Sequence, residues 1–263
     1  MPQHHPYSRR ALRQRRDDWL RRNAKLITIL TVGAITVFAF ITVLLLQTMP
    51  STSFTWWLLG VMQACVVAAY LSMLYSAFLA FDGEAIWHVR GAWGEDNTRS
   101  ELQRAKRKRL VWGWVDSVAL QHGDIDHLVV TRRGGLVAID SKWRNRIHDT
   151  NDMARAAQKV RLRAEGLTRD LLRGGARGSR RARVNPLGVT SIVVLWGAAQ
   201  HDVPDGAEVD GIAFIPGRKL TSWLAQLDGQ PVDQGAANEV VRDVKRYRAL
   251  AEKAQATRAS ARE

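Results

Sequence analysis

The sequence predicts an α/β domain with a mixed sheet, preceded by a transmembrane helical hairpin. Two observations predict this architecture. Residues 26–46 and 54–81 are long runs without a charged side chain. From residue 82 onward, short apolar runs rich in β-branched residues alternate with segments of helical periodicity, which is the pattern of helices packed on the faces of a sheet.

The two uncharged runs are each long enough to span a bilayer, whose core needs roughly 20 apolar helical residues. Residues 47–53 separate them. Two buried helices of a soluble protein would carry a polar face, which these runs lack. The first run also exceeds the apolar region of a cleavable signal peptide, and no A-x-A-like cleavage site follows it. We therefore expect a two-helix hairpin over residues 26–81.

Basic residues flank the hairpin on both sides, while the segment between the two runs carries no charge. Eight precede the first run: Arg9, Arg10, Arg13, Arg15, Arg16, Arg21, Arg22 and Lys25. Arg90, Arg99, Arg104 and Lys106 follow the second run. Positively charged flanks stay on the cytoplasmic side. Both termini and the α/β domain are therefore expected in the cytoplasm, at an inner (plasma) membrane of the bacterial type.

The overall charge predicts an anionic partner. The 263 residues include 39 Lys and Arg against 25 Asp and Glu, a net charge of +14. Nucleic acid and lipid headgroups would both satisfy this excess, and charge alone does not separate them. The single cysteine, Cys65, excludes an intrachain disulfide and a cysteine-based zinc cluster, in keeping with a reducing cytoplasm.

The expected order of elements after the hairpin is helix, three strands, helix, two strands and helix. The first helix covers residues 86–109; the strands cover 115–120, 125–131 and 136–141; the second helix covers 152–172; the later elements cover 190–196, 211–215, 220–227 and a helical tail from 238. On the second helix, Met153, Ala156, Val160, Ala164, Leu167 and Leu171 form the expected buried face. The chain thus divides into a basic cytoplasmic segment (1–25), the hairpin (26–81), the α/β domain (82–230) and a C-terminal helix and tail (231–263).

Two carboxylates and one ammonium are expected to converge at one edge of the sheet. Asp126 stands at the start of one strand, and Asp140 and Lys142 stand at the end of the next, after a turn at Gly134-Gly135. Antiparallel pairing brings these ends together, and alternate residues of a strand share a face. Two carboxylates can hold Mg²⁺ while water and substrate phosphate complete its coordination. A nearby lysine can orient the nucleophile.

The triplet Asp-x-Lys is not specific by itself. The chain holds a second one at residues 243–245, here called the decoy triplet, on an amphipathic helix where it forms a solvated face. A structural interpretation also exists for the first triplet. Asp126 and Asp140 would then accept hydrogen bonds from turn amides, and Lys142 would be an exposed residue that protects a sheet edge.

A resemblance to a known family joins these residues. The pattern resembles the nuclease-related domain (NERD) branch of the PD-(D/E)XK nucleases. It is carried by Gly94-Glu95 in the first helix, Asp126-His127, Asp140-x-Lys142, Gln158 in the second helix, and Gly211-Ile-Ala-Phe-Ile-Pro-Gly before a short helix. It runs from about residue 91 to 227. One departure is Asp140, where this domain more often has Glu, so that a shorter side chain must reach the metal.

The resemblance implies a restriction-endonuclease-like αβββαβ core and a divalent-metal-dependent nuclease that uses Mg²⁺ or Mn²⁺. Asp126 and Asp140 would be metal ligands, and Lys142 the catalytic lysine. Glu95 would support the metal or its water, and Gln158 would position water or DNA. From the residues alone, Glu95 could instead pair with Arg99, Gln158 could be an ordinary polar helix residue, and His127 could be structural.

Arginines near this site suit phosphate contacts, which need charge and no sequence readout. They are Arg144, Arg146, Arg177, Arg180, Arg181 and Arg183. The last four could equally serve as a solubilising or lipid-facing segment. We therefore expect a membrane-anchored nuclease that acts on nucleic acid, with DNA favoured. The alternatives are a catalytically inert nucleic-acid-binding or interaction module of the same fold, and a lipid-binding scaffold that leaves the Asp126, Asp140 and Lys142 grouping unexplained.

Overall fold

The computed structural model describes residues 7–48, 52–120, 123–175 and 187–260. Within them the chain divides into two compact units, one over residues 8–89 and one from residue 90 onward. Each unit is described by itself.

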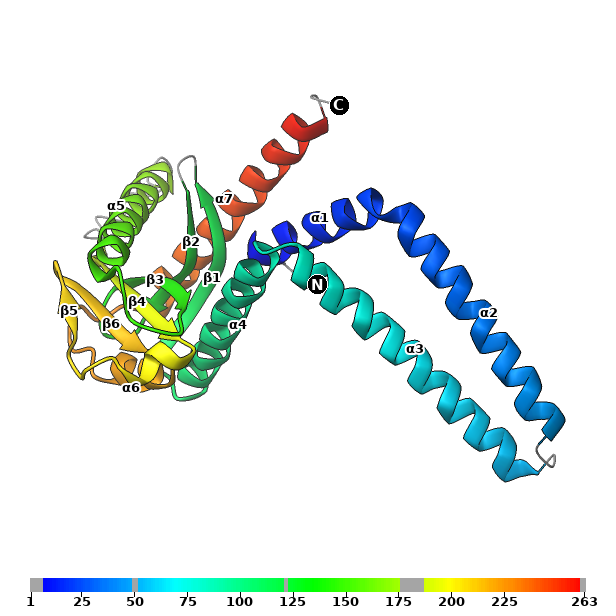
Figure 1. Ribbon diagram of the computed structural model, residues 1–263. Helices are drawn as coiled ribbons and strands as arrows, with labels where there is room; N and C mark the ends of the chain where they lie inside the picture. Colours follow the sequence, from blue (N-terminus) through cyan, green and yellow to red (C-terminus); the bar gives the residue numbers. More distant parts are fainter. Residues whose placement is uncertain (1–6, 49–51, 121–122, 176–186, 261–263) are drawn as a thin grey trace. The chain divides into compact units, whose positions relative to one another are not determined.

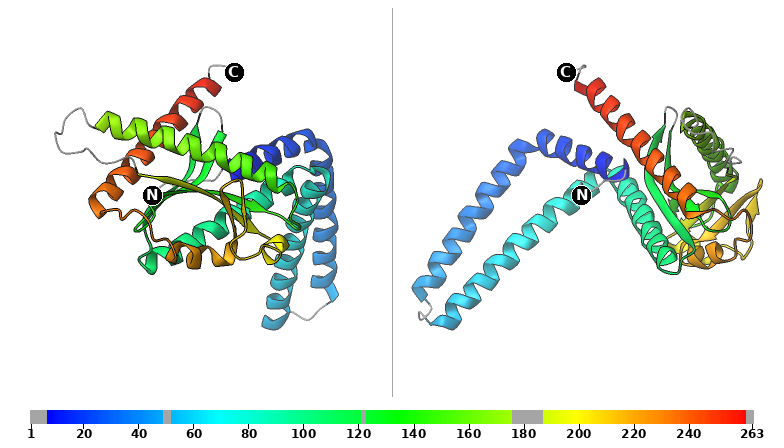
Figure 2. Two further views of the ribbon diagram at one scale, coloured as in Figure 1. Left: turned by 90° about the vertical axis from the view of Figure 1, so that its left-hand side faces the viewer. Right: turned by 180° about the vertical axis from the view of Figure 1, so that it is seen from behind.

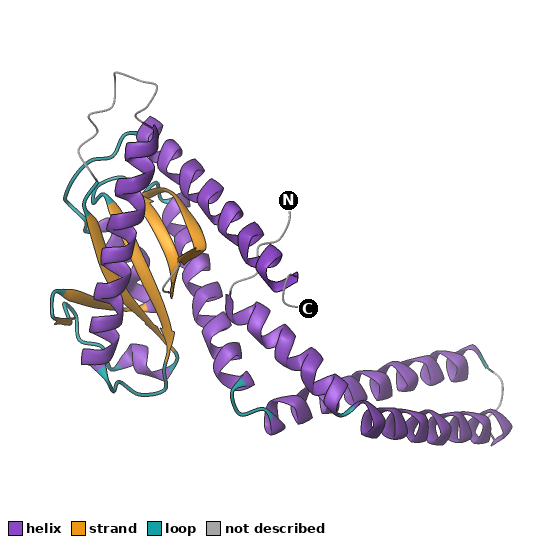
Figure 3. Cartoon of the chain, turned by 90° about the horizontal axis from the view of Figure 1, so that it is seen from above, coloured by secondary structure: helices purple, strands orange, loops and turns teal. Residues whose placement is uncertain are grey.

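The first unit is helical. It contains α1 (Tyr7–Arg22), α2 (Ala24–Thr48) and α3 (Ser53–Phe81) (Figure 3). At about 1.5 Å per residue, α2 and α3 are about 37 and 43 Å long, more than the roughly 30 Å core of a bilayer. Their most apolar stretches have mean hydropathies of 2.7 and 1.9. No residue of α2 is buried, and in α3 only Phe78 is. By length and composition, both helices can cross a membrane.

Polar and aromatic contacts join the three helices. The hydroxyl groups of Thr31 and Tyr70 lie 2.5 Å apart between α2 and α3. The guanidinium group of Arg15 on α1 pairs with Asp82, at 3.1 Å, and with Glu84. The ring centroids of Trp19 and Phe78 lie 5.9 Å apart. Residues 7–22 were expected only as a basic segment, and they form a helix because arginine, alanine and leucine are good helix formers even without an apolar face.

The second unit is the expected α/β domain, and its core follows the expected αβββαβ order. That core comprises α4 (Ala85–Arg107), β1 (Val111–Leu120), β2 (Gly123–Thr131), β3 (Leu136–Trp143), α5 (Thr150–Gly175) and β4 (Val189–Trp196). After it come η1 (Ala198–His201), β5 (Glu208–Val209), β6 (Ile212–Pro216), η2 (Gly217–Lys219), α6 (Leu220–Ala225) and α7 (Gln234–Ser260). The prediction of a mixed α/β fold is confirmed. The two-residue strand β5 was not expected, because two residues carry no readable periodicity.

The sheet has six strands in the order β1-β2-β3-β4-β6-β5. β2 is antiparallel to both of its neighbours, β1 and β3, whereas β3, β4 and β6 are parallel. The sheet is therefore mixed, as expected. Helix α5 lies on one face of the sheet, and α4 and α6 lie on the opposite face (Figures 1 and 2).

Side chains that alternate along the strands fill a core on each face. Ala138 of β3 packs with Val160 and Ala164 of α5, and with Val240 and Val244 of α7. The other face of the same strands packs on α4 and α6, through Val137, Ile139, Leu102, Leu220 and Leu224. Helix α7, expected as a C-terminal helix and tail, thus takes part in the core through its first half.

Among the positions whose burial the structure describes, which exclude Leu171, the buried face of α5 differs from the expected one at one residue. Met153, Val160, Ala164 and Leu167 are buried as expected, but Ala156 is exposed and its neighbour Ala157 is fully buried. The Ser191 hydroxyl of β4 donates to the Ala157 carbonyl oxygen at 2.9 Å. Helical spacing permits a step of three or four residues, and here the contact with β4 selects the step of four from Met153.

The turn between β2 and β3 requires glycine at one position. Gly135 has φ +67°, and a Cβ atom there would lie 2.6 Å from the Gly188 carbonyl oxygen. Gly135→Ala should lower the free energy of unfolding by about 1–3 kcal/mol or more, because it adds backbone strain and a clash. Gly166→Ala on α5, where a Cβ atom meets nothing within 4 Å, is the control and should be neutral or stabilising. Urea unfolding of both variants measures this, and equal stability would contradict the structure.

Candidate active site

The pairing of β2 with β3 brings the two predicted metal ligands together. His127 is opposite Ile139, and continuing this antiparallel register by one residue places Asp126 opposite Asp140. Asp140 and Lys142 follow Ala138 at alternate positions of β3, so they lie on the face of the sheet that α5 covers. The expected convergence of two carboxylates and one ammonium at this end of the strands is therefore present in the geometry.

Each carboxylate has a defined partner. The backbone amide of Ser141 donates to Oδ2 of Asp126 at 2.8 Å. Nζ of Lys142 lies 2.6 Å from Oδ1 of Asp140, whose side chain is almost fully buried. The amide belongs to strand β3 rather than to a turn, and Lys142 is paired and only partly exposed. This arrangement differs from the structural interpretation, in which turn amides would hold the carboxylates and Lys142 would be an exposed edge residue.

Burial, and then repulsion between neighbouring carboxylates, governs the protonation of Asp126. Withdrawal from water, and then the negative charge of Asp140, raise the pKa of Asp126 to about 7, and the charge of Glu95 acts in the same direction. Burial by itself lowers the pKa of Lys142, but the two aspartates outweigh it, so that this pKa lies above its ordinary value. Lys142 is therefore an ammonium at neutral pH. Asp126 gives up its proton much less readily than an exposed aspartate does.

The two helical candidates approach from opposite faces of the sheet. Glu95 of α4 is buried, and its negative charge contributes to the raised pKa of Asp126. Arg99, its proposed alternative partner, lies 3.0 Å from Asp116 and 4.0 Å from Asp96. On α5, the buried Oε1 atom of Gln158 has no hydrogen-bond partner among the described residues. Such an unsatisfied acceptor on the helix that covers Asp140 fits a group that binds water or substrate.

The structure describes two of the six arginines that were predicted to contact phosphate. Arg144 lies one residue beyond the end of β3, and its charge lowers the pKa of Lys142, which places it close to the site. Arg146 is exposed in the loop that follows. Arg177, Arg180, Arg181 and Arg183 lie outside the described residues.

His127 belongs to a polar network that the sequence did not reveal. Its Nδ1–H group donates to Oδ1 of Asp116 on β1 at 2.7 Å, and Nε of Arg99 on α4 donates to Oδ2 of the same carboxylate at 3.0 Å. Burial alone would raise the pKa of Asp116, but His127 and Arg99 outweigh it and hold the pKa below its usual value. The backbone carbonyl oxygen of Asp116 accepts from Arg248 of α7 at 2.9 Å. His127 therefore has a structural partner and ties β2 to β1.

A second network joins α4 to the strands. The hydroxyl groups of Thr98 and Ser141 lie 2.9 Å apart, and the indole N–H of Trp196 donates to the Thr98 hydroxyl at 2.8 Å. Ser141 is the middle residue of the Asp-x-Lys triplet. In the sequence, Thr98 is only a threonine in a predicted helix and Ser141 only a serine in a predicted strand. Nothing at either position indicates that the two side chains are in contact.

The residues at this site fit a hydrated divalent ion better than a cage made entirely of protein ligands. No group of three or more His, Cys, Asp or Glu side chains is placed to hold a metal within the described ranges. Two neighbouring carboxylates, Asp126 and Asp140, are present. Mg²⁺ is usually bound by one or two carboxylates, with water and substrate phosphate at its other positions.

One comparison with known proteins identifies the domain. Residues 90–195 match the model of the family described as "NERD: Nuclease-related domain". These residues form a nuclease-related domain. No curated protein and no solved structure matches the chain.

The matched segment of the nuclease-related domain contains every predicted residue of the metal site. It begins in α4 before Glu95 and ends in β4, so that it covers β2, β3 and most of the αβββαβ core. The resemblance was expected to continue to about residue 227, and the match ends before β6 and α6. The nuclease-related domain thus contributes the core and its strand ends, to which β5, β6, α6 and α7 are added.

The raised pKa of Asp126 predicts a specific dependence of stability on pH. In the metal-free protein, the unfolded state ionises Asp126 near its ordinary pKa, and the folded state does so only near pH 7. The free energy of unfolding of the wild type therefore falls as the pH rises toward about 7. In Asp126→Asn the side chain cannot ionise, so this pH-dependent loss is absent. From pH 5 to pH 8.5, the free energy of unfolding of the variant should rise by roughly 3 kcal/mol relative to that of the wild type, at about 1.4 kcal/mol per pKa unit. Urea unfolding in chelator measures this difference, and a gain that is the same at both pH values would contradict it.

Proposed function

We propose that the protein is a membrane-anchored, divalent-metal-dependent nuclease that hydrolyses phosphodiester bonds, with DNA as the favoured substrate. The observation that carries this proposal is the meeting of Asp126, Asp140 and Lys142 at one end of β2 and β3. This grouping lies within a nuclease-related domain.

Asp126 and Asp140 would hold the ion, Mg²⁺ or Mn²⁺. The ion would supply a water of lowered pKa and would offset negative charge on the phosphate. Burial and then the charge of Asp140 raise the pKa of Asp126. The second of these effects supports the assignment, because a cation between the two carboxylates removes their repulsion.

Lys142 acts in this proposal as a fixed positive charge. Its raised pKa keeps it protonated at neutral pH, so it does not accept a proton from water. An ammonium at this position can donate hydrogen bonds to a phosphate oxygen or orient the attacking water. Glu95 would accept a hydrogen bond from a water beside the two aspartates, and the free Oε1 atom of Gln158 would accept one from water or from the substrate.

The nucleic-acid strand would follow the positive charge next to the site. Arg144 and Arg146 extend β3 beyond Lys142, and the arginines from 177 to 183 would add further phosphate contacts. Contacts of this kind depend on charge alone, which accords with the net charge of +14.

The alternative is a catalytically inert nucleic-acid-binding module of the same fold. The ion pair between Lys142 and Asp140 favours it, because that pair occupies one of the carboxylates that a metal would need.

Substitutions at the three central residues separate these two functions. Asp126→Asn and Asp140→Asn should lower plasmid nicking by at least the roughly hundredfold that loss of metal-supporting groups costs, because each removes a charged ligand. Lys142→Ala should retain metal binding and lose cleavage. Lys245→Ala, which alters the exposed lysine of the decoy triplet, is the control and should change neither property.

The measurements are nicking by the full-length protein in detergent with Mg²⁺, Ca²⁺ or chelator, and calorimetric titration with the ion. If the wild type neither binds the ion nor cleaves single- or double-stranded DNA or RNA, the nuclease proposal is wrong and the binding module takes its place.

Helices α2 and α3 would anchor the domain in the membrane. Their apolar side chains are exposed all around both helices, as the lipid-facing surface of a spanning hairpin would be. In the sequence, basic residues precede α2 and follow α3, and such positively charged flanks stay on the cytoplasmic side.

Reporter fusions test this orientation. Reporters fused after Ser8 and after Glu263 should both report the cytoplasm, and a reporter inserted at Pro50 should report the outside. An external C-terminus would also contradict the nuclease proposal, because the substrate would then be on the other side of the membrane.

A further inference from the structure

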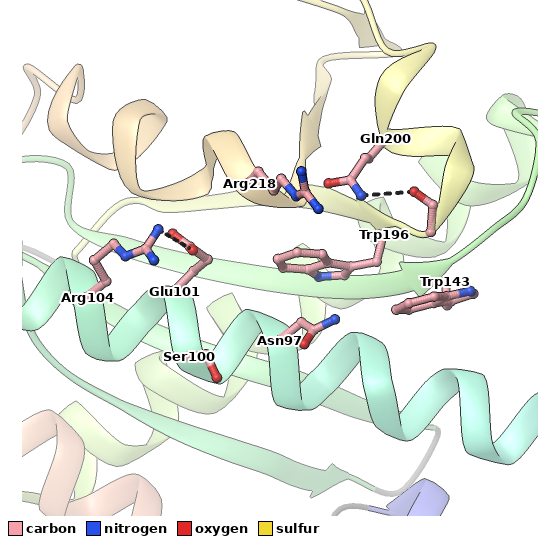
Figure 4. Close-up of a pocket in the computed structure, with 9 residues that line it drawn as sticks. Asn97, Ser100, Glu101, Arg104, Trp143, Trp196, Gln200 and Arg218 are labelled. Carbon is pink, nitrogen blue, oxygen red and sulfur yellow. Dashed lines mark hydrogen bonds and ion pairs between the residues drawn. The ribbon is translucent and has the colours of Figure 1, made fainter.

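A polar cavity lies on the face of the sheet that is opposite Asp140 and Lys142. It has a volume of about 420 Å³ and opens at the carboxyl ends of β3 and β4 (Figure 4). Its lining comes from four separate parts of the chain: Asn97, Ser100, Glu101 and Arg104 of α4; Trp143; Trp196, Gly197 and Gln200; and Arg218. Pockets for small molecules and cofactors fall in this range of size.

Two indole rings give the cavity rigid apolar walls. Trp196 is buried, its N–H donates to Thr98, and a Cβ atom on Gly217 would come within 2.4 Å of its ring. Its position is therefore fixed by the core. Trp143 is only partly buried and packs edge-on against Trp93, with 5.5 Å between the ring centroids. Trp143 is thus the indole that can offer ring surface to a ligand.

One positive charge in the cavity is left unneutralised. Arg104 lies 2.8 Å from Glu101, which also accepts from the Thr221 hydroxyl at 2.7 Å, so that these two charges cancel. Arg218 is exposed at the rim and has no ion pair within the described part of the chain. An anionic group of a ligand would meet this guanidinium.

One buried acceptor in the cavity is also left without a donor. The Gln200 side chain donates through Nε2 to the Gly197 carbonyl oxygen at 2.9 Å, which fixes its orientation. Its buried Oε1 atom has no hydrogen-bond partner among the described residues, and Figure 4 shows it on the side of Arg218. A buried acceptor without a partner destabilises the protein, and an N–H group of a ligand would satisfy it.

We propose that this cavity binds one nucleotide unit of a nucleic-acid strand. The base would stack on Trp143 and donate an N–H group to Oε1 of Gln200, and a phosphate would pair with Arg218. Aromatic rings, a carboxamide and an arginine are the groups that recognise unpaired bases.

This inference rests on the proposed function and specifies its substrate. Trp143 directly follows Lys142, so the cavity and the metal site lie at the same end of β3 on opposite faces. A strand that crosses this end places a base in the cavity and a neighbouring phosphate at Asp126 and Asp140. A base paired inside a duplex cannot enter the cavity, so the substrate is single-stranded or has a base displaced from the stack.

Binding in the presence of chelator tests the cavity separately from the chemistry. The probes are a fluorescent single-stranded oligonucleotide, the matching duplex, and adenosine monophosphate as competitor, with the full-length protein in detergent. Arg218→Ser and Gln200→Leu should each weaken single-strand binding roughly tenfold and leave duplex binding unchanged. Lys219→Ser is the matched control. That neighbouring cation pairs with Asp205 at 2.5 Å and does not line the cavity, so the change should be less than twofold.

Three outcomes would overturn the assignment. Equal losses for Arg218→Ser and Lys219→Ser would mean that only surface charge is involved. Equal losses for single strand and duplex would exclude an unpaired base. If adenosine monophosphate binds and the oligonucleotide does not displace it, the cavity is a site for a free nucleotide.

Failure of the nuclease proposal gives a different result. A protein that binds the single strand through Arg218 and Gln200 in chelator, but never cleaves it with Mg²⁺, keeps the cavity and loses the catalytic assignment. Lys245→Ala, at an exposed lysine outside both sites, should bind the single strand as the wild type does.

Discussion

The register between β2 and β3 is the constraint on which the site depends. It places Asp126 opposite Asp140 and directs the Ser141 amide to the Asp126 carboxylate at 2.8 Å. A slip of one residue would turn Asp126 to the other face and separate the two charges. The turn at Gly135 holds this register, because its left-handed backbone and its contact with Gly188 leave no room for a side chain. Burial raises the pKa of Asp126, and the repulsion from Asp140 that this register creates raises it further, so that the fold maintains a pair of acids that a cation would stabilise.

Helix α4 connects this pair of acids to the rest of the domain. It brings Glu95 toward Asp126, and Thr98 joins it to Ser141 of β3 and Trp196 of β4. Farther along, Arg99 shares the Asp116 carboxylate with His127. One helix therefore lines both the acidic site and the cavity beside Trp196. A change in its position would alter both sites together, which links recognition of a strand to the proposed chemistry.

Local sequence patterns predict much of the fold and part of the candidate site. Strands β2 and β3 and helix α5 follow from alternation and helical periodicity, and Asp126, Asp140 and Lys142 follow from their places at strand ends. The sequence could not reveal the Asp116, His127 and Arg99 network, because its members are joined only by tertiary packing. The cavity was missed for the same reason, since α4, Trp143, Gln200 and Arg218 are distant in the chain. At Ala156 and Ala157, two small residues satisfy the helical period equally well, and packing against β4 makes the choice.

Anomalous diffraction from crystals grown with Mn²⁺ would locate the divalent ion that we propose Asp126 and Asp140 hold together. We expect a peak about 2.1 Å from a carboxylate oxygen of each aspartate. The ammonium of Lys142 should then no longer lie in contact with Asp140. Ordered carboxylates with no peak between them, and Lys142 still paired with Asp140, would mean that the two aspartates do not hold a divalent ion.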